Sequence, residues 1–509
     1  MNERPSEGSY GQILKSTTLV GGSQVINILI GIVRTKFMAV LLGPAGVGLM
    51  GMYQAATGIV GTVTGLGISS SGVRQIAEAA GSGDETRIAR TIYTLRRISL
   101  LLGVFGMLVT MTLSPYLSRV TFGTEEHAWA IAVLGVTLFL GSVSGGQAAL
   151  VQGMRRIADL ASMSVLGALL GTVLSVPIIY FWGESGIVPS LLAVSAMIIL
   201  PSWWYARKVK VRKVSLCLAD MIGEARGLLS LGLAFMASSV MGAAVLYLTR
   251  VLVVRKLGME SVGLYQAATT LSTMYIGVIL NAMGMDFYPR LTAVANDNVT
   301  VNRLVNEQTE VGLLLATPGL LATLAVAPYV IHLFYSAQFV PAYQVLRWQI
   351  LGIFLRVVAW PIGFVLLAKG KGRVFFWTEL VWNLVHVGFI WLGLRLFGLI
   401  GTGIAFFVLY VTYTAGIFAV VNRISGFRWS AANIRIGLSL MAVIGSAFLL
   451  PYLLPEGFAL MVNAVLTIGV TAWCLREVYA LVGPAWFTDF VSKLKDRIGF
   501  SVSHFEERG

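Results

Sequence analysis

The chain has few charged residues for its length. Only 12% of its 509 residues are Asp, Glu, Lys or Arg, whereas 57% are apolar, and the mean hydropathy is +0.81. A soluble domain of this size needs a well-charged surface, so the composition argues against one. The sequence instead predicts a polytopic membrane protein.

Cysteines and nucleotide-binding motifs are scarce as well. The two cysteines, Cys217 and Cys474, are both predicted on the cytoplasmic side, which excludes a disulfide or cysteine-metal framework. No GxxxxGK[ST] string occurs, so direct use of ATP is not expected. The glycine string at 46–51 matches a dinucleotide fingerprint, but no predicted strand precedes it. We therefore expect no catalytic residue, no metal, no cofactor and no enzyme.

Long apolar runs fill most of the chain. About fourteen runs of about 20 residues or more are each long enough to cross a ~30 Å hydrocarbon core as an α-helix. No segment alternates like a barrel strand, so the predicted fold class is an all-α integral membrane protein. The expected spans are 12–42, 46–80, 87–118, 128–153, 157–182, 186–206, 228–256, 261–295, 303–334, 341–368, 373–396, 400–422, 434–453 and 458–482.

Lysine and arginine are concentrated in every second connection, as in 87–97, 207–213 and 369–373. The other connections are short and hold acids such as Glu125 and Glu184. By the positive-inside rule both termini are predicted to be cytoplasmic, which requires an even number of spans. These membrane-facing loops explain the net charge of +14, so nucleic acid is not expected as a partner.

Two strings far apart in the chain repeat one another. LGPAGVGL at 42–49 and LGMESVGL at 257–264 share Leu, Gly, Val, Gly and Leu at an offset of 215 residues. An even number of helices per repeat predicts two parallel six-helix lobes around a central cavity. The expected divisions are an N-terminal lobe at 1–206, a cytoplasmic linker at 207–227, a second lobe at 228–423, two additional helices at 424–482 and a cytoplasmic tail at 483–509.

Three arginines lie deep inside the expected spans. Arg34 and Arg250 precede the glycines that end their helices by 9 and 8 residues, and Arg356 precedes Lys369 by 13. At 1.5 Å per residue these depths are roughly 12–20 Å, so all three must face a protein interior. Each is either neutralised within the protein or left to bind an anion. No expected span places Asp or Glu at the depth of Arg34 or Arg250, and guanidinium forks suit phosphate oxygens, so we expect a diphosphate-binding site.

Five further residues are candidates for a secondary or gating role. Arg74, Asp286 and Arg290 lie one to two turns inside the cytoplasmic ends of their spans, and Asp286 with Arg290 at i,i+4 is equally suited to a structural ion pair. Glu379 and His386 are two turns apart on the expected helix 373–396. They could form a proton path or serve as buried polar packing.

The chain resembles the O-antigen translocases, the Wzx-type polysaccharide flippases, whose superfamily includes the lipid II flippase and multidrug exporters. The resemblance covers nearly the whole chain. It depends on the helix with Arg34 that ends in LGPAGVGL, on MDFYPRLTAVANDN at 285–298, and on the two additional C-terminal helices. It implies an alternating-access carrier for an undecaprenyl-diphosphate-linked oligosaccharide in the bacterial inner membrane, with Arg34 and Arg250 lining the cavity.

The implied partners are the undecaprenyl-diphosphate-linked glycan, membrane lipids, and the polymerase and glycosyltransferases of the same pathway. A lipid II flippase is the alternative, although the chain has Gly48 to Met52 where that family has an acidic residue. A drug or cation exporter would need carboxylates where this chain offers arginines. A membrane glycosyl polymerase would need an outer loop longer than about 15 residues.

Overall fold

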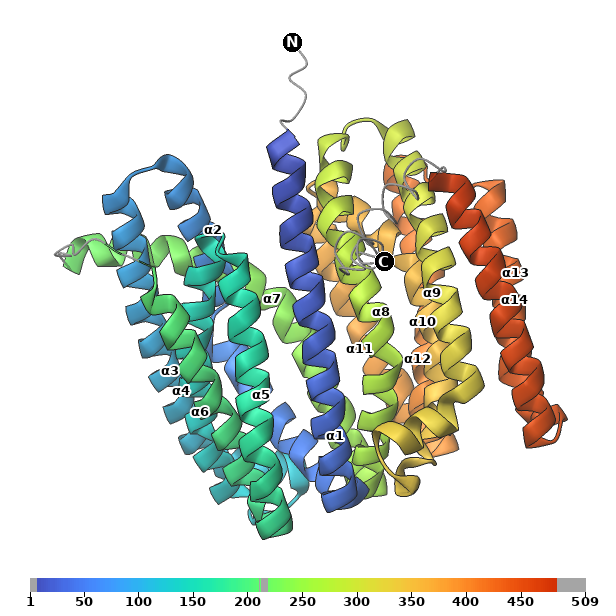
Figure 1. Ribbon diagram of the computed structural model, residues 1–509, viewed down its shortest axis with the longest axis horizontal. Helices are drawn as coiled ribbons and strands as arrows, with labels where there is room; N and C mark the ends of the chain where they lie inside the picture. Colours follow the sequence, from blue (N-terminus) through green and yellow to red (C-terminus); the bar gives the residue numbers. More distant parts are fainter. Residues whose placement is uncertain (1–6, 210, 212–217, 483–509) are drawn as a thin grey trace, which may run out of the picture. The chain divides into compact units, whose positions relative to one another are not determined.

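The structure is a computed structural model that describes residues 7–209, 211 and 218–482. These residues form α-helices and two short 3-10 helices and include no strand, which confirms the all-α class (Figure 1). The bounds are α1 Glu7–Thr64, α2 Ile68–Ser82, α3 Glu85–Phe122, α4 Ala128–Gly153, α5 Ile157–Trp182, η1 Gly183–Gly186, α6 Ile187–Arg207, α7 Leu218–Leu257, α8 Met259–Ala293, α9 Asn298–Phe334, η2 Ala337–Phe339, α10 Ala342–Ala368, α11 Gly372–Phe397, α12 Ile400–Ser425, α13 Ala431–Leu453 and α14 Glu456–Val482.

The described helices make this a multi-pass membrane protein, although the number of spans differs from the expected one. Ten helices are long and apolar enough to cross a membrane, or up to twelve if two bent pairs each count as one span. Two of these stretches, Gly22–Thr64 and Ile157–Arg207, each cover two expected spans. Gly43 with φ of 63° interrupts the first, and η1 interrupts the second. The total of fourteen stays a prediction.

Several helix ends lie where hydropathy places them, and others do not. α4 and α5 have the predicted bounds. α7 begins at Leu218, so part of the expected linker is instead the start of this helix, which bends by 42° between Gly223–Ala237 and Ser239–Leu257. The reason is that no helix breaker separates the amphipathic segment from the apolar run. The rest of the linker, Cys217 and the tail at 483–509 lie outside the described residues.

The expected span 46–80 is broken, which corrects the prediction of one continuous helix. The second part of α1 ends at Thr64, and α2 begins at Ile68. Between them Leu66 and Gly67 have positive φ values of 49° and 64°. A Cβ at Gly67 would lie 2.2 Å from the carbonyl oxygen of Gly232 in α7, so only glycine permits this close approach.

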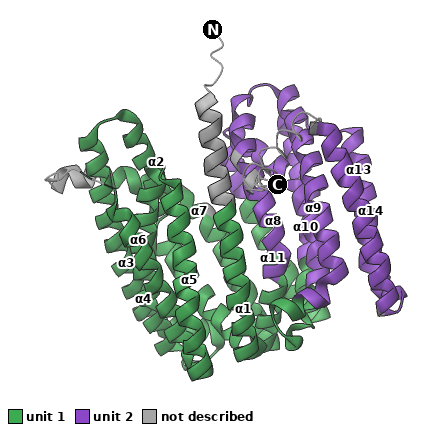
Figure 2. Cartoon of the chain, in the orientation of Figure 1, with its two compact units in different colours: residues 1–268, 331–345, 379–405 green, residues 269–330, 346–378, 406–509 purple. Residues whose placement is uncertain are grey.

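The chain divides into two compact units (Figure 2). Unit 1 comprises residues 1–268, 331–345 and 379–405, and unit 2 comprises 269–330, 346–378 and 406–509. Several helices therefore contribute to both units. The predicted division into lobes, linker, additional helices and tail stays a prediction.

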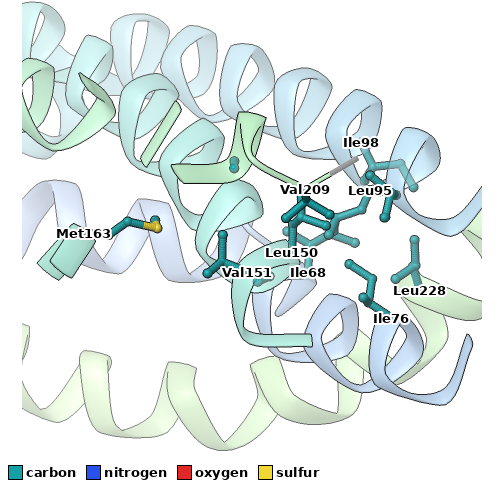
Figure 3. Close-up of a cluster of buried hydrophobic side chains, with 12 residues drawn as sticks. Ile68, Ile76, Leu95, Ile98, Leu150, Val151, Met163, Val209 and Leu228 are labelled. Carbon is teal, nitrogen blue, oxygen red and sulfur yellow. The ribbon is translucent and has the colours of Figure 1, made fainter. Parts of the chain in front are cut away.

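Unit 1 contains α3 to α6 side by side (Figure 1). One of its cores is a cluster in which Ile76, Ile92, Leu95 and Leu150 are fully buried. Figure 3 shows Val209, which follows α6, against Leu95 and Leu150. Burying such side chains contributes about 1.5–3 kcal/mol each, so this cluster fixes the helix ends around it.

Unit 2 is held together by polar side chains as well as by apolar ones. Asn306 of α9 accepts hydrogen bonds at its side-chain oxygen from the backbone N–H of Ser430 at 2.8 Å and from the Asn433 amide at 2.9 Å. Lys369, at the end of α10, donates to the Ala295 carbonyl and to Asn298, both at 2.6 Å. The basic string at 369–373 thus has its first lysine engaged in tying α10 to the connection between α8 and α9.

Candidate functional site

Arg34 lies on the first part of α1 and is half-buried. Its Nε and Nη2 atoms are inaccessible, and neither has a hydrogen-bond partner among the described residues. No carboxylate of the described part of the chain pairs with it. A buried guanidinium whose N–H groups are unsatisfied is costly in an apolar setting, so these donors are available to an anion.

Arg250 of α7, also half-buried, is anchored at one end only. Its Nη1 donates to the carbonyl oxygen of Gly51 at 2.7 Å, while its buried Nε has no partner within the described residues. A Cβ at Gly51 would lie 1.8 Å from Oε1 of Gln266, and this oxygen is also buried without a described partner. Parts of α1, α7 and α8 in unit 1 therefore meet at a polar point with free hydrogen-bonding capacity.

The two repeated strings lie against each other. A Cβ at Gly48 would be 2.2 Å from the carbonyl oxygen of Met259, and a Cβ at Gly263 would be 2.0 Å from that of Pro44. Gly263 and Met259 follow Gly48 and Pro44 by 215 residues each. The contact is thus reciprocal, as across a local two-fold axis, and glycine at both positions lets the backbones touch.

Other cations of unit 1 are engaged at helix ends. Lys36 donates through Nζ to the carbonyl oxygen of His332 at 2.8 Å, in the last turn of α9. Arg255 donates to the carbonyl oxygen of Val120 at 2.9 Å and to that of Arg119 at the end of α3. Cations at helix C-termini are stabilised by the helix dipole. These two side chains serve the scaffold, which sets them apart from Arg34.

A hydroxyl-lined pocket of about 360 Å³ lies within unit 1, beside the break between α1 and α2. Its polar lining comes from Thr62, Ser69, Ser70, Ser142 and Ser239, together with several glycines. Hydroxyl groups both donate and accept hydrogen bonds, so such a lining suits a polyhydroxylated ligand.

The remaining predicted residues are distributed over both units. Arg356 of α10, in unit 2, is half-buried and makes no hydrogen bond or ion pair with described residues. Asp286 and Arg290 form the predicted i,i+4 ion pair at 3.0 Å, and both side chains are more than half exposed. Arg74 is exposed on α2. That Arg34, Arg250 and Arg356 share one cavity stays a prediction.

Glu379 and His386 both lie on α11 and are half-buried. Each interacts with other residues, and the Glu379 carbonyl also accepts a hydrogen bond from Asn383 at 2.8 Å. Within the part of the chain that the structure describes, no group of three or more His, Cys, Asp or Glu side chains is placed to hold a metal ion. The proton path stays a prediction.

Sequence reasoning missed two polar groups. Arg347 of α10 is only 2% exposed, and its guanidinium lies 4.6 Å and 4.3 Å from the ring centroids of Phe448 and Tyr452. The i,i+4 spacing of these aromatics on α13 is the one signal in the sequence. His127, just before α4, shares a 2.8 Å hydrogen bond between Nδ1 and the Tyr53 hydroxyl.

Comparison with solved structures identifies the fold. An inward-facing multidrug resistance MATE transporter of the MOP superfamily matches with a TM-score of 0.68 and 18% identity, over 79% of this chain and 94% of that one. The lipid II flippase MurJ in an inward closed conformation matches with a TM-score of 0.66 and 13% identity, over 92% and 99%. The chain therefore has the fold of these transporters.

Sequence comparison leads in the same direction. The lipid III flippase of Escherichia coli (strain K12) is 22% identical over 422 residues, which cover 81% of this chain and 99% of that protein. These relatives are transport proteins, which confirms the expectation that the chain is not an enzyme. The family described as polysaccharide biosynthesis protein matches residues 37–344, more than half of the 509. The chain belongs to this polysaccharide biosynthesis protein family.

Proposed function

We propose that the chain is a flippase that moves an undecaprenyl-diphosphate-linked oligosaccharide, an O-antigen or related surface polysaccharide repeat unit. It acts by alternating access, from the cytoplasmic to the periplasmic leaflet of the bacterial inner membrane, with both termini cytoplasmic. The family, the transporter fold and the relative named as a lipid III flippase support this proposal. The glycosyltransferases and the polymerase of the pathway would supply and consume its substrate.

The observation that carries the proposal is the state of the Arg34 guanidinium. Its inaccessible Nε and Nη2 lie in a membrane helix without a hydrogen-bond partner among the described residues. Holding a cation at this depth costs at least about 2.5–3.5 kcal/mol, which a purely structural residue would offset with a carboxylate. A diphosphate offers several oxygens to a guanidinium fork and restores the missing interactions during transport.

Arg250 and Arg356 complete the proposed diphosphate site. Arg250 has one N–H group fixed on Gly51 and its Nε left over, so it is positioned before the substrate arrives. Arg356 has the matching depth in α10. Arg74, Asp286, Arg290, Glu379 and His386 are assigned secondary or gating roles. The hydroxyl-lined pocket beside the α1–α2 break offers suitable groups for sugar hydroxyls.

Complementation tests both the activity and its substrate. The full chain is expressed in three strains that lack an O-antigen flippase, a lipid III flippase or a lipid II flippase, respectively. We expect surface glycan to be restored in the first strain, with Arg34→Lys partly active and Arg34→Glu inactive at matched expression. Rescue of the lipid II strain alone would replace the proposal with the alternative. Wild-type activity of Arg34→Glu would overturn the diphosphate site.

A further inference from the structure

A second cationic pocket lies in unit 1, at the helix ends predicted to face the cytoplasm. Its volume is about 460 Å³. It is lined by Tyr93 and Arg96 of α3, Gln147 of α4, Trp203 and Arg207 of α6, and Val209. A pocket of this size accommodates a headgroup or a small molecule rather than a single ion.

Both charged groups of this pocket are arginines. Arg96 is half-buried and makes no hydrogen bond or ion pair with the described residues. Arg207 is exposed, and its guanidinium lies 5.0 Å from the centroid of the Trp203 ring, which orients it. No described carboxylate lines the pocket. Two like charges beside one cavity repel each other, so an anion that contacts both is favoured.

The neutral polar groups of the pocket are also suited to an anion. The side-chain oxygen of Gln147 accepts a hydrogen bond from the Ser202 hydroxyl at 2.5 Å, which leaves its amide nitrogen as a donor. The Tyr93 hydroxyl can donate as well. With the two guanidinium groups, the polar lining is rich in donors.

The apolar side of the pocket indicates where the anion comes from. Val209 belongs to the buried cluster with Leu95 and Leu150, so the segment that follows α6 is anchored there (Figure 3). Trp203 and Trp204 are 49% and 61% exposed at the end of α6, and exposed tryptophans at helix ends are typical of the membrane–water interface. A lipid headgroup reaches such a pocket while its acyl chains stay in the bilayer.

We propose that this pocket binds the phosphate of an anionic phospholipid from the cytoplasmic leaflet, through Arg96 and Arg207. Basic pockets between transmembrane helices on the cytoplasmic side are known positions for such headgroups. The site is separate from the diphosphate site of Arg34 and Arg250, because its residues come from α3, α4 and α6. Its ligand is a resident lipid rather than the transported substrate.

The test is a binding titration of the purified full chain by native mass spectrometry from detergent. The probes are phosphatidylglycerol, phosphatidylcholine and inorganic phosphate. We expect phosphatidylglycerol to bind and phosphatidylcholine not to bind, with about fivefold weaker binding in Arg96→Gln or Arg207→Gln and a larger loss in the double variant. Arg97→Gln is the matched control, since Arg97 is the next residue on α3 and does not line the pocket.

A second measurement avoids dependence on the glutamine variants. In nanodiscs, brominated phosphatidylglycerol should quench the tryptophan fluorescence that is lost in Trp203→Phe, and brominated phosphatidylcholine should quench it less. Equal quenching by both lipids, or equal phosphatidylglycerol affinity in Arg96→Gln, Arg207→Gln and Arg97→Gln, would refute the proposal. Arginine-dependent binding of inorganic phosphate without binding of phosphatidylglycerol would assign the pocket to a soluble anion instead.

Discussion

Arg250 and Gly51 are joined by a hydrogen bond of 2.7 Å that runs from the guanidinium Nη1 to the glycine carbonyl. The two residues lie 199 positions apart in the chain. The bond fixes one edge of the guanidinium plane and leaves the buried Nε for other partners. A planar fork can hold a backbone carbonyl and a ligand oxygen at the same time, which an ammonium group does less well.

Arg250→Lys should therefore retain part of the transport, and Arg250→Glu should abolish it. Lysine keeps the positive charge but loses the fork, whereas glutamate repels a diphosphate. Surface glycan in a complemented strain, at matched expression, is the measurement. Lys256→Glu is the control, because Lys256 is exposed at the end of the same helix. Equal, near-normal export by Arg250→Lys and Arg250→Glu would contradict a role in anion binding.

Gly48→Ala and Gly263→Ala should each destabilise the protein by about 1–3 kcal/mol. The added methyl group would meet backbone carbonyl oxygens at 2.2 Å and 2.0 Å, and backbone atoms cannot rotate away as side-chain ends do. Gly58→Ala is the matched control, because nothing lies within 4 Å of its Cβ position. Thermal unfolding followed by size-exclusion chromatography gives the comparison. The same midpoint in all three variants would show that the two strings do not touch.

His127 should make the protein less stable in acid. Burial lowers its pKa below 6.5, while Glu126 and Glu184 act in the opposite direction. Since the unfolded chain takes up the proton first, the contribution of His127 is complete above about pH 6.5 and declines as the pH falls toward the folded pKa. The bond to the Tyr53 hydroxyl must also rearrange when Nδ1 becomes protonated.

The thermal midpoint between pH 7.5 and 5 measures this effect. The wild type should lose stability across this window faster than His127→Gln, whose amide cannot titrate. Parallel pH profiles for the two proteins would remove His127 from the groups that respond to acid.

Membrane voltage should drive transport more than the pH gradient does. A diphosphate carries about two negative charges, and moving each outward across 100 mV, inside negative, releases about 2.3 kcal/mol. We expect Glu379→Gln and His386→Ala to leave considerable transport in proteoliposomes with each gradient imposed separately. Transport that ignores voltage, follows a proton or sodium gradient and is lost in Glu379→Gln would identify a different driving force.

Hydropathy predicted the helices well where the chain itself marks their ends. α4 and α5 have the expected bounds because their apolar runs stop at polar or glycine residues, such as His127, Arg156 and Gly183. It failed within 46–80, where apolar and glycine residues continue through the break at 65–67. That break is set by the close approach of Gly232, which lies far along the chain.

The candidate site follows the same pattern. The depth of Arg34 could be read from its spacing to Gly43, and its lack of a described partner agrees with the scarcity of acids. The Gly51 carbonyl as partner of Arg250 could not be predicted, because every residue has such a carbonyl. The burial of Arg347 was missed because its aromatic neighbours, Phe448 and Tyr452, are about a hundred residues away in the sequence.

The contact of Gly48 with Met259, repeated by Gly263 with Pro44, bears on how such a chain arose. A surface that fits its own repeat also fits a second copy of itself. A half-length ancestor with one LGxxxVGL string would have carried both sides of this contact. Two such molecules could pair through it as a homodimer, and gene duplication followed by fusion would then have preserved an interface that already existed.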